Sequence, residues 1–325
     1  MVERDLVIVG GGPAGMAAAV SAYENGVKDI LLLERDQHLG GILNQCIHPG
    51  FGIDYFNEIL TGPEYADRFI KKTESIPQID VSLQSFAVHL ENDKTLTYIK
   101  PGKLEIVRPK TIIMATGCRE RTREMIHIPG TRPSGVFPAG LAQKLINIEG
   151  LLPGKDAVIV GSGDIGLIMA RRFLLEGARV KAVIEIQKET RGLKRNVVQC
   201  VEDFGTPLYY GHKVSDIYGK DRVEKIRVVK VDENFADVPG SEFEIECDTV
   251  LISVGLIPEN ELIEMAGVAV DKSTNSPVSE ELNKTSIPGL FVCGNSYKVY
   301  DIVDSVSRDS VIAGRLAAEY LKGLK

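Results

Sequence analysis

The sequence contains two glycine-rich turns of the form Gly-x-Gly-x-x-Gly, each placed directly after an apolar run of strand length. The first covers residues 10–15 (GGGPAG) and follows residues 6–9 (LVIV). The second covers residues 161–166 (GSGDIG) and follows residues 157–160 (AVIV). A single such motif is weak evidence, but each copy here precedes a stretch with helical periodicity and then another apolar run. Each copy therefore predicts the strand–turn–helix–strand unit that binds a dinucleotide.

An acidic residue ends the strand that follows each glycine turn. Glu34 closes the run at 30–33, and Glu185 closes the run at 180–184. A carboxylate at this place accepts hydrogen bonds from ribose hydroxyls and repels a 2′-phosphate. We therefore predict NAD rather than NADP at the second turn, while Lys188 and Arg191, a few residues downstream, keep NADP as the alternative.

Two dinucleotide turns on one chain suggest that a flavin and a nicotinamide are held face to face, so that a hydride can pass between them. In each turn the first glycine makes the bend, the second lets the backbone approach the pyrophosphate, and the third allows the helix to pack on the strand. The N-terminus of the helix then offers N–H groups and a positive dipole end to the phosphates. The predicted nicotinamide site consists of Gly161, Ser162, Gly163, Asp164, Ile165, Gly166, Glu185 and Gly255.

Composition and charge exclude several classes of partner. The 325 residues are 44% hydrophobic and 26% charged, which is ordinary for a two-domain protein. The net charge of −7, without a long basic run, argues against binding of nucleic acid or an anionic membrane surface. No apolar run approaches the roughly 20 residues that a transmembrane helix needs. The first strand begins too close to the N-terminus for a signal peptide, so we expect a cytoplasmic location.

The five cysteines are scattered singly along the chain, at Cys46, Cys118, Cys200, Cys247 and Cys293. Without a CxxC or CxxxxC pair, local spacing builds no metal site, no iron–sulfur cluster and no redox-active vicinal disulfide. We therefore predict no metal.

The order of elements is repeated in the two halves of the chain. Each glycine turn is followed by a polar, strand-rich stretch and then by a strand that ends in glycine, at 111–117 and 249–255, with shorter strands before them at 104–106 and 242–245. The first half resumes at 289–294, and a final helix follows at roughly 304–321. The predicted fold is therefore α/β, with two Rossmann-like domains of three layers (ββα), and the second domain is inserted into the first. The predicted domains are 1–118 with 255–325, and 119–254.

These motifs together resemble a known family. The turn GGGPAG, the segment Ala115-Thr116-Gly117, the turn GSGDIG and the segment 291–295 (FVCGN) resemble the pyridine nucleotide–disulfide oxidoreductase superfamily, at the size of its thioredoxin reductase branch. The resemblance implies FAD in the discontinuous domain and NAD(H) in the inserted one. Residues 40–52 (GGILNQCIHPGFG) are similar to flavoprotein subunits of opine, proline and hydrogen cyanide synthase enzymes. Residues 60–66 (LTGPEYA) are similar to the version paired with a glycerol-3-phosphate dehydrogenase-like flavoprotein.

The resemblance also implies a set of FAD-binding residues in which Asn295 and Asp301 meet the ribityl chain and the pyrimidine end of the flavin. Asn295 stands where the family usually has Asp, and Ile168 stands where a Glu usually follows the second turn. Disulfide chemistry is excluded because the redox cysteines of the family are missing. The implied FAD set is Gly10, Gly12, Pro13, Ala14, Gly15, Glu34, Arg35, Gly41, Ile42, Ala115, Thr116, Gly117, Gly294, Asn295 and Asp301.

Few side chains are candidates for chemistry of their own. Cys46 and His48 belong to the Gly-Gly loop that should lie beside the flavin ring, but a lone cysteine more often packs and a lone histidine more often serves as scaffold. The arginines Arg119, Arg121 and Arg123 form a basic cluster, which either steers an anionic partner or is a solvated linker face.

Because the chain has no disulfide of its own, the sequence predicts an FAD-dependent oxidoreductase that passes electrons between NAD(H) and FAD and on to or from a partner redox subunit. The expected assembly is a hetero-oligomer, such as a multisubunit dehydrogenase of the glycerol-3-phosphate dehydrogenase type. Two alternatives remain open at this point. One is a stand-alone NADH oxidase or a reductase of a small redox protein, and the other is a non-catalytic nucleotide-binding scaffold.

Overall fold

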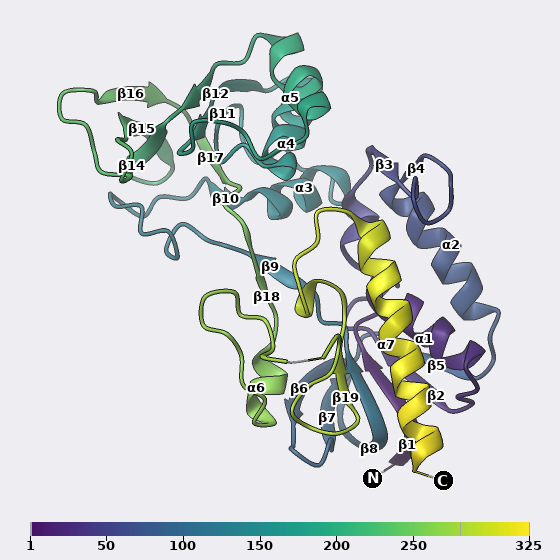
Figure 1. Ribbon diagram of the computed structural model, residues 1–325. Coiled ribbons are helices and arrows are strands. Elements are labelled where there is room, and N and C mark those ends of the chain that lie inside the picture. The colour runs from purple at the N-terminus through teal and green to yellow at the C-terminus, as the bar shows by residue number, and fades with distance from the viewer. Residues whose placement is uncertain (1, 280, 325) are drawn as a thin grey trace. The chain divides into compact units, whose positions relative to one another are not determined.

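The computed structural model describes residues 2–279 and 281–324 of the chain. The chain divides into two compact units, shown in Figure 1. Unit 1 consists of Met1–Arg119 with Ile257–Lys325, and unit 2 is Glu120–Leu256. The chain passes between the units through β9 (Cys118–Glu120) and β18 (Leu256–Pro258), which pair with each other as a two-stranded sheet. Unit 2 is therefore an insertion in unit 1.

The sheet of unit 1 combines a parallel part with an antiparallel meander. Strand β8 joins the two parts because its C-terminal half pairs in parallel with β1 and β19, while its N-terminal half pairs antiparallel with β7. The order is β5-β2-β1-β8-β7-β6, with β19 also on β8. The strands are β1 (Val2–Val9), β2 (Ile30–Leu33), β5 (Ile79–Ser82), β6 (Phe86–Leu90), β7 (Leu96–Lys100), β8 (Lys103–Met114) and β19 (Leu290–Val292).

Alternate side chains of each parallel strand in unit 1 face different cores. In β1, Leu6 and Ile8 join the core formed with the helices, while Val7 and Val9 join the core formed with the meander. This alternation follows from the two-residue period of a strand and requires both faces of the sheet to be covered. Three helices cover the first face, α1 (Pro13–Glu24), α2 (Gly62–Glu74) and α7 (Val303–Gly323). The other face carries the meander and α6 (Glu261–Met265).

Unit 2 repeats this plan with a parallel sheet in the order β10-β17-β11-β12-β13. Its alternation is the same, since Ala157 and Ile159 face the helices while Val158 and Val160 face a separate antiparallel sheet. The parallel strands are β10 (Val136–Pro138), β11 (Asp156–Val160), β12 (Arg179–Glu185), β13 (Leu208–Tyr210) and β17 (Thr249–Ile252). The helices are α3 (Ala139–Asn147), α4 (Asp164–Leu175) and α5 (Lys194–Cys200), and the antiparallel strands are β14 (His212–Gly219), β15 (Val223–Lys230) and β16 (Phe243–Glu246).

The remaining short elements lie in the connections. They are the 3₁₀ turns η1 (Gly41–Gln45), η2 (Glu202–Phe204) and η3 (Gly294–Ser296), and the two-stranded ribbon of β3 (Pro49–Phe51) and β4 (Leu60–Thr61).

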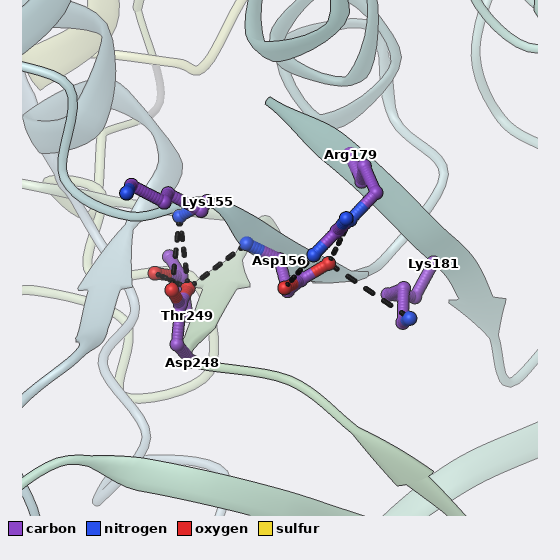
Figure 2. Close-up of polar contacts among 6 residues, drawn as sticks. All are labelled: Lys155, Asp156, Arg179, Lys181, Asp248 and Thr249. Carbon is purple, nitrogen blue, oxygen red and sulfur yellow. Dashed lines mark hydrogen bonds and ion pairs between the residues drawn. The ribbon is translucent and has the colours of Figure 1, made fainter. Parts of the chain in front are cut away.

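Polar side chains fix the amino ends of the parallel strands in unit 2, as Figure 2 shows. Asp156, the first residue of β11, receives two hydrogen bonds of 2.6 Å from Arg179, the first residue of β12. Asp248, directly before β17, accepts hydrogen bonds of 3.0 Å from the backbone N–H groups of Lys155 and Asp156. The glycine turn follows the other end of β11, so this cluster stabilises the sheet without taking part in the turn.

The predicted fold is confirmed, with two three-layer α/β units and the second inserted into the first. One detail differs from the expectation. The two short strands expected at 104–106 and 111–117 form a single strand, β8, that runs from Lys103 to Met114. Pro109 lies between the two expected segments, opposite Arg4 near the start of the parallel pairing, and the strand continues through it.

Candidate functional site

The first glycine turn connects β1 to α1, and its three glycines meet different surroundings. Gly10 has a φ of 112°, and a Cβ there would collide with the carbonyl oxygen of Ala115. A Cβ on Gly15 would collide with the carbonyl oxygen of Gly10. A Cβ on Gly12, in contrast, would have 3.9 Å to the nearest atom, the Cα of Gly41. The protein itself therefore requires the first and third glycines, while the middle one leaves a space that no protein group fills.

The N-terminus of α1 opens at this space. Gly12 is the N-cap residue, no side chain caps the helix, and Pro13 occupies the first turn without an acidic residue. The N–H groups of the first turn and the positive end of the helix dipole are therefore available to an anion. A cradle lined by backbone N–H groups fits a pyrophosphate, which is the group that a dinucleotide would place there.

Glu34 is hydrogen-bonded to the backbone of the first turn and is not a free surface acid. Its side chain is buried, with Oε2 accepting from the N–H of Gly11 at 2.7 Å and Oε1 from the N–H of Asp36 at 2.8 Å. A carboxylate has about four lone-pair positions, so each oxygen can still accept a ribose hydroxyl. The same group can thus hold the turn and bind a ribose.

The second glycine turn, between β11 and α4, has the same internal geometry. Gly161 has a φ of 98°, and a Cβ there would collide with the carbonyl oxygen of Ser253. A Cβ on Gly166 would lie only 2.6 Å from the carbonyl oxygen of Gly161, whereas one on Gly163 would meet nothing within 4 Å. The middle glycine again borders a space free of protein atoms at the start of a helix without a side-chain cap.

Glu185 takes the place in unit 2 that Glu34 has in unit 1. Its Oε2 accepts from both the N–H and the hydroxyl of Ser162, at 2.8 and 2.6 Å, and its Oε1 accepts from the N–H of Gln187 at 2.8 Å. In the first turn of α4, Asp164 Oδ1 accepts from the N–H of Leu193 and from Asn196 Nδ2. Ile165 packs against the helix core, and Gly255 accepts a hydrogen bond from the N–H of Arg121.

The Gly-Gly segment at 40–41 lies against the first glycine turn. A Cβ on Gly41 would lie 3.1 Å from the Cα of Gly12, and the N–H of Gly40 donates to the carbonyl oxygen of Gly11 at 2.9 Å. Ile42, next to this pair, is 58% exposed. The structure thus brings the Gly-Gly segment to the first glycine turn.

Cys46 packs at the start of α2. Its thiol donates to the carbonyl oxygen of Ile42 at 3.3 Å, and a Cβ on Gly62 would lie 2.7 Å from the Cβ of Cys46. Burial raises the pKa of the Cys46 thiol to about 12, which keeps it protonated at neutral pH. His48 lies at the surface with its ring 5.0 Å from the ring of Phe51 and Nδ1 3.2 Å from the carbonyl oxygen of Pro49. These surroundings favour packing over nucleophilic chemistry at Cys46.

The other predicted FAD residues meet beside the same turn. Ala115 donates its N–H to Val9 at the end of β1, and Thr116 donates its hydroxyl to the carbonyl oxygen of Glu259 at 2.7 Å. A Cβ on Gly294 would lie 2.7 Å from the Cβ of Ala14 in the first turn of α1. Asn295 Nδ2 donates to the sulfur of Cys118 at 3.5 Å.

Two charged residues of the predicted FAD set lie at the periphery. Arg35 is half exposed and forms a 3.6 Å ion pair with Glu259, and Asp301 is exposed at the start of the segment leading into α7.

Two buried carboxylates on α7, Asp304 and Asp309, are not among the residues predicted from the sequence. Asp304 accepts from the N–H groups of Gly52 and Tyr55, at 3.2 and 2.7 Å, and Asp309 accepts from the N–H of Gly294 at 2.7 Å. No local pattern could have distinguished them, because an aspartate near a helix start usually faces water and their partners lie far away in the sequence.

Two of the three arginines in the expected basic cluster, Arg119 and Arg123, are engaged by other groups of the protein. Arg119 forms a 2.6 Å ion pair with Glu261. Arg123 is buried and donates to the carbonyl oxygens of Ile128, Pro129 and Thr131, so it holds a loop together. Neither the steering role nor the solvated face describes Arg123, because its guanidinium is occupied by backbone acceptors.

Three further properties concern the part of the chain that the structure describes. None of the five cysteines there forms a disulfide. Residues 2–279 and 281–324 contain no group of three or more His, Cys, Asp or Glu side chains that could hold a metal ion. No helix among them is long and apolar enough to cross a membrane.

The fold and the paired glycine turns define a class of protein with two dinucleotide-binding domains. The pyridine nucleotide-disulphide oxidoreductase family matches residues 4–308 of this sequence, so the chain belongs to that family. Its members are oxidoreductases that use FAD and pyridine nucleotides.

Similarity to individual proteins extends over nearly the whole chain. It is 26% identical to the hydrogen cyanide synthase subunit HcnB of Pseudomonas protegens, over 96% of this chain and 69% of HcnB. It is 25% identical to an opine oxidase subunit of Agrobacterium tumefaciens, over 97% of this chain but only 64% of the opine oxidase protein. The fold matches thioredoxin reductase from T. acidophilum with a TM-score of 0.76 and 21% identity, covering all of both chains.

Proposed function

We propose that this chain is an FAD-dependent oxidoreductase subunit that passes electrons between NAD(H) and bound FAD and on to or from a partner redox subunit. The observation that carries the proposal is the pair of matching glycine turns. In each turn, the middle glycine borders a space without protein atoms, and a buried carboxylate accepts a hydrogen bond from a backbone N–H of the turn. A bound flavin would supply a ring that accepts or donates a hydride, and the protein would supply position and electrostatics.

Each unit has its own part in this proposal. In unit 1, the turn at 10–15 would hold the pyrophosphate of FAD, Glu34 its ribose, and the segments at 41–42, 115–117 and 294–295 the flavin part. In unit 2, the turn at 161–166 would hold the nicotinamide nucleotide, and the carboxylate of Glu185 would favour NAD because it repels a 2′-phosphate. We propose domains at 1–118 with 255–325 and at 119–254 for these two cofactors.

The cysteines and the relatives both support a partner subunit. Members of the family that use a disulfide relay electrons through two cysteines, but this chain has no cysteine pair to do so. HcnB and the opine oxidase relative are by name subunits of larger enzymes. We propose a multisubunit dehydrogenase as the setting, with a glycerol-3-phosphate dehydrogenase-like flavoprotein as the partner that residues 60–66 suggest.

An anaerobic titration of the FAD-loaded protein tests the proposal. We expect NADH to bleach the flavin absorbance rapidly and NADPH to do so far more slowly. Turnover in air without a partner should remain well below the measured rate of flavin reduction. A flavin that stays oxidised with both nucleotides would contradict hydride exchange, and aerobic turnover as fast as reduction would indicate a stand-alone oxidase instead.

A further inference from the structure

Asp309, in the second turn of α7, is a buried carboxylate without a cationic partner. Only 5% of the residue is exposed, and no lysine or arginine of the described residues forms an ion pair with it. Its Oδ2 accepts from the N–H of Gly294 at 2.7 Å, and its Oδ1 accepts from Asn283 Nδ2 at 2.8 Å. Burial raises the pKa of this carboxyl, and hydrogen bonds from Gly294, Asn283 and Tyr300 oppose that rise. Burying an ionised carboxylate with only neutral hydrogen-bond donors costs folding free energy, which suggests that these contacts serve a purpose besides stability.

The donor Gly294 lies directly on the first glycine turn. It has a φ of 64°, and a Cβ there would lie 2.7 Å from the Cβ of Ala14 and 3.3 Å from Cγ1 of Val306. The backbone at 294 is thus held between the first turn of α1 and the side of α7. Asp309 fixes this approach because it binds the N–H of the same residue.

The segment that follows Gly294 is closed by Asp309 at its other end. Asn295 Oδ1 accepts from the N–H of Tyr300 at 3.1 Å, and the phenol of Tyr300 interacts electrostatically with Asp309. These contacts connect Gly294, Asn295, Tyr300 and Asp309 in a ring. The carboxylate of Asp309 thus contacts both ends of the segment from 294 to 300.

Asn283 extends this arrangement to the strand before the segment. It is completely buried and has a φ of 60°, which is unusual for a residue other than glycine. Its Nδ2 donates to both Asp309 Oδ1 and the carbonyl oxygen of Val292, the last residue of β19. The end of β19, the segment after it and the second turn of α7 are therefore held together at a single carboxylate.

We propose that Asp309 is a positioning residue for the flavin, which holds the segment 294–300 against the first turn of α1 in the shape that binds FAD. The inference rests on the proposed function in assigning FAD to unit 1. Asp309 acts through Gly294 and Asn295, and it has no direct part in hydride transfer. The side chain of Asn295, which carries no charge, can serve the flavin only if its orientation is fixed, and the ring through Tyr300 fixes it.

The test compares FAD binding to purified apoprotein variants by quenching of flavin fluorescence. Asp309→Asn keeps the size of the side chain but loses the charge and one acceptor, and we expect an FAD dissociation constant at least about tenfold higher. Tyr300→Phe removes only the phenol contact and should give a smaller loss of about threefold. The matched control is Asp29→Asn, because Asp29 also accepts a backbone N–H in unit 1, from Asp5 at 3.1 Å, but directly before β2 at the other end of the sheet. Its affinity for FAD should stay within about twofold of the wild type.

A second readout separates positioning from general destabilisation. We expect the visible circular dichroism of bound flavin to change in Asp309→Asn and Tyr300→Phe but not in Asp29→Asn, because only the first two alter the surroundings of the ring. Wild-type affinity and spectrum in Asp309→Asn, or in Tyr300→Phe where the first variant does not fold, would overturn this inference alone. A wild-type protein that takes up no FAD would overturn the proposed function and this inference with it.

Discussion

The two glycine turns share one geometry but differ in how closely the protein surrounds them. A Cβ on Gly12 would lie 3.9 Å from the Cα of Gly41, in the Gly-Gly segment at 40–41. Gly294 packs on Ala14 in the first turn of α1. At Gly163, no atom lies within 4 Å of the corresponding place. The first turn is therefore covered beside its middle glycine by the segment at 40–41. The second turn has no protein atom at that place, although residues 190–196 contact it at Ser162 and Asp164.

The two helix starts also differ in charge, and this difference again favours tighter anion binding at the first turn. The first turn of α1 has no acidic side chain, while that of α4 has Asp164. A carboxylate near a helix N-terminus competes with a phosphate for the same positive potential. Within the proposed function, the enclosed turn suits a cofactor that stays bound, and the open turn with an acid suits a nucleotide that must leave after each turnover.

The strongest test of this comparison places a methyl group at the middle glycine of each turn. Gly12→Ala and Gly163→Ala should both fold, because φ is −76° and −67° and the nearest atom leaves room for a Cβ. We expect Gly12→Ala to lower FAD affinity by about a hundredfold or more, because the added methyl group would fill the space in which the pyrophosphate contacts the backbone. Gly163→Ala should keep its FAD and instead raise the KM for NADH.

Flavin content after purification and steady-state kinetics with NADH measure the two effects. Each variant is the control for the other, because each carries the same substitution in an equivalent turn. Full flavin content in Gly12→Ala would contradict the assignment of FAD to the first turn. An unchanged KM in Gly163→Ala would contradict the assignment of NAD(H) to the second.

The second test concerns Glu185 and the choice of nucleotide. Glu185→Gln removes the charge that would repel a 2′-phosphate, so the ratio of kcat/KM for NADH to that for NADPH should fall by about tenfold. Because Gln has a single acceptor oxygen, the bonds to Ser162 and Gln187 can no longer all form, and binding of both nucleotides should weaken. Glu189→Gln, at an exposed position four residues further, should leave the ratio unchanged. A wild-type preference for NADPH would contradict the role given to Glu185.

The smallest effect is expected at Cys46, beside the first turn. Cys46→Ala should keep the rate of flavin reduction by NADH within about twofold of the wild type, because the thiol has a packing role. The raised pKa of about 12 also predicts slow alkylation of Cys46 at pH 8 and faster alkylation as the pH approaches that value, since only the thiolate reacts. Peptide mapping of the alkylated protein would measure this, with urea-unfolded protein as the control. Rapid labelling of Cys46 at neutral pH together with loss of flavin reduction would show a reactive thiol instead.

Local features of the sequence predicted much of the fold. The two glycine turns, the strands before them and the carboxylates Glu34 and Glu185 are each recognisable within about 30 residues. The strand at Ile30–Leu33 was predicted to the residue, and the final helix to within two residues at each end. These elements are predictable because backbone conformation at a glycine turn and the period of buried side chains are set by near neighbours.

Long-range packing decided the rest. Asp304 and Asp309 resemble ordinary helix residues in the sequence, and only the fold brings Gly52, Tyr55 and Gly294 to their carboxylates. Arg123 belonged to an apparent basic cluster, but the fold surrounds its guanidinium with three carbonyl oxygens. The sequence by itself thus determined the two dinucleotide turns, because their conformation depends on local spacing. The tertiary structure alone decided which polar groups are buried beside them, because burial depends on segments that lie far apart along the chain.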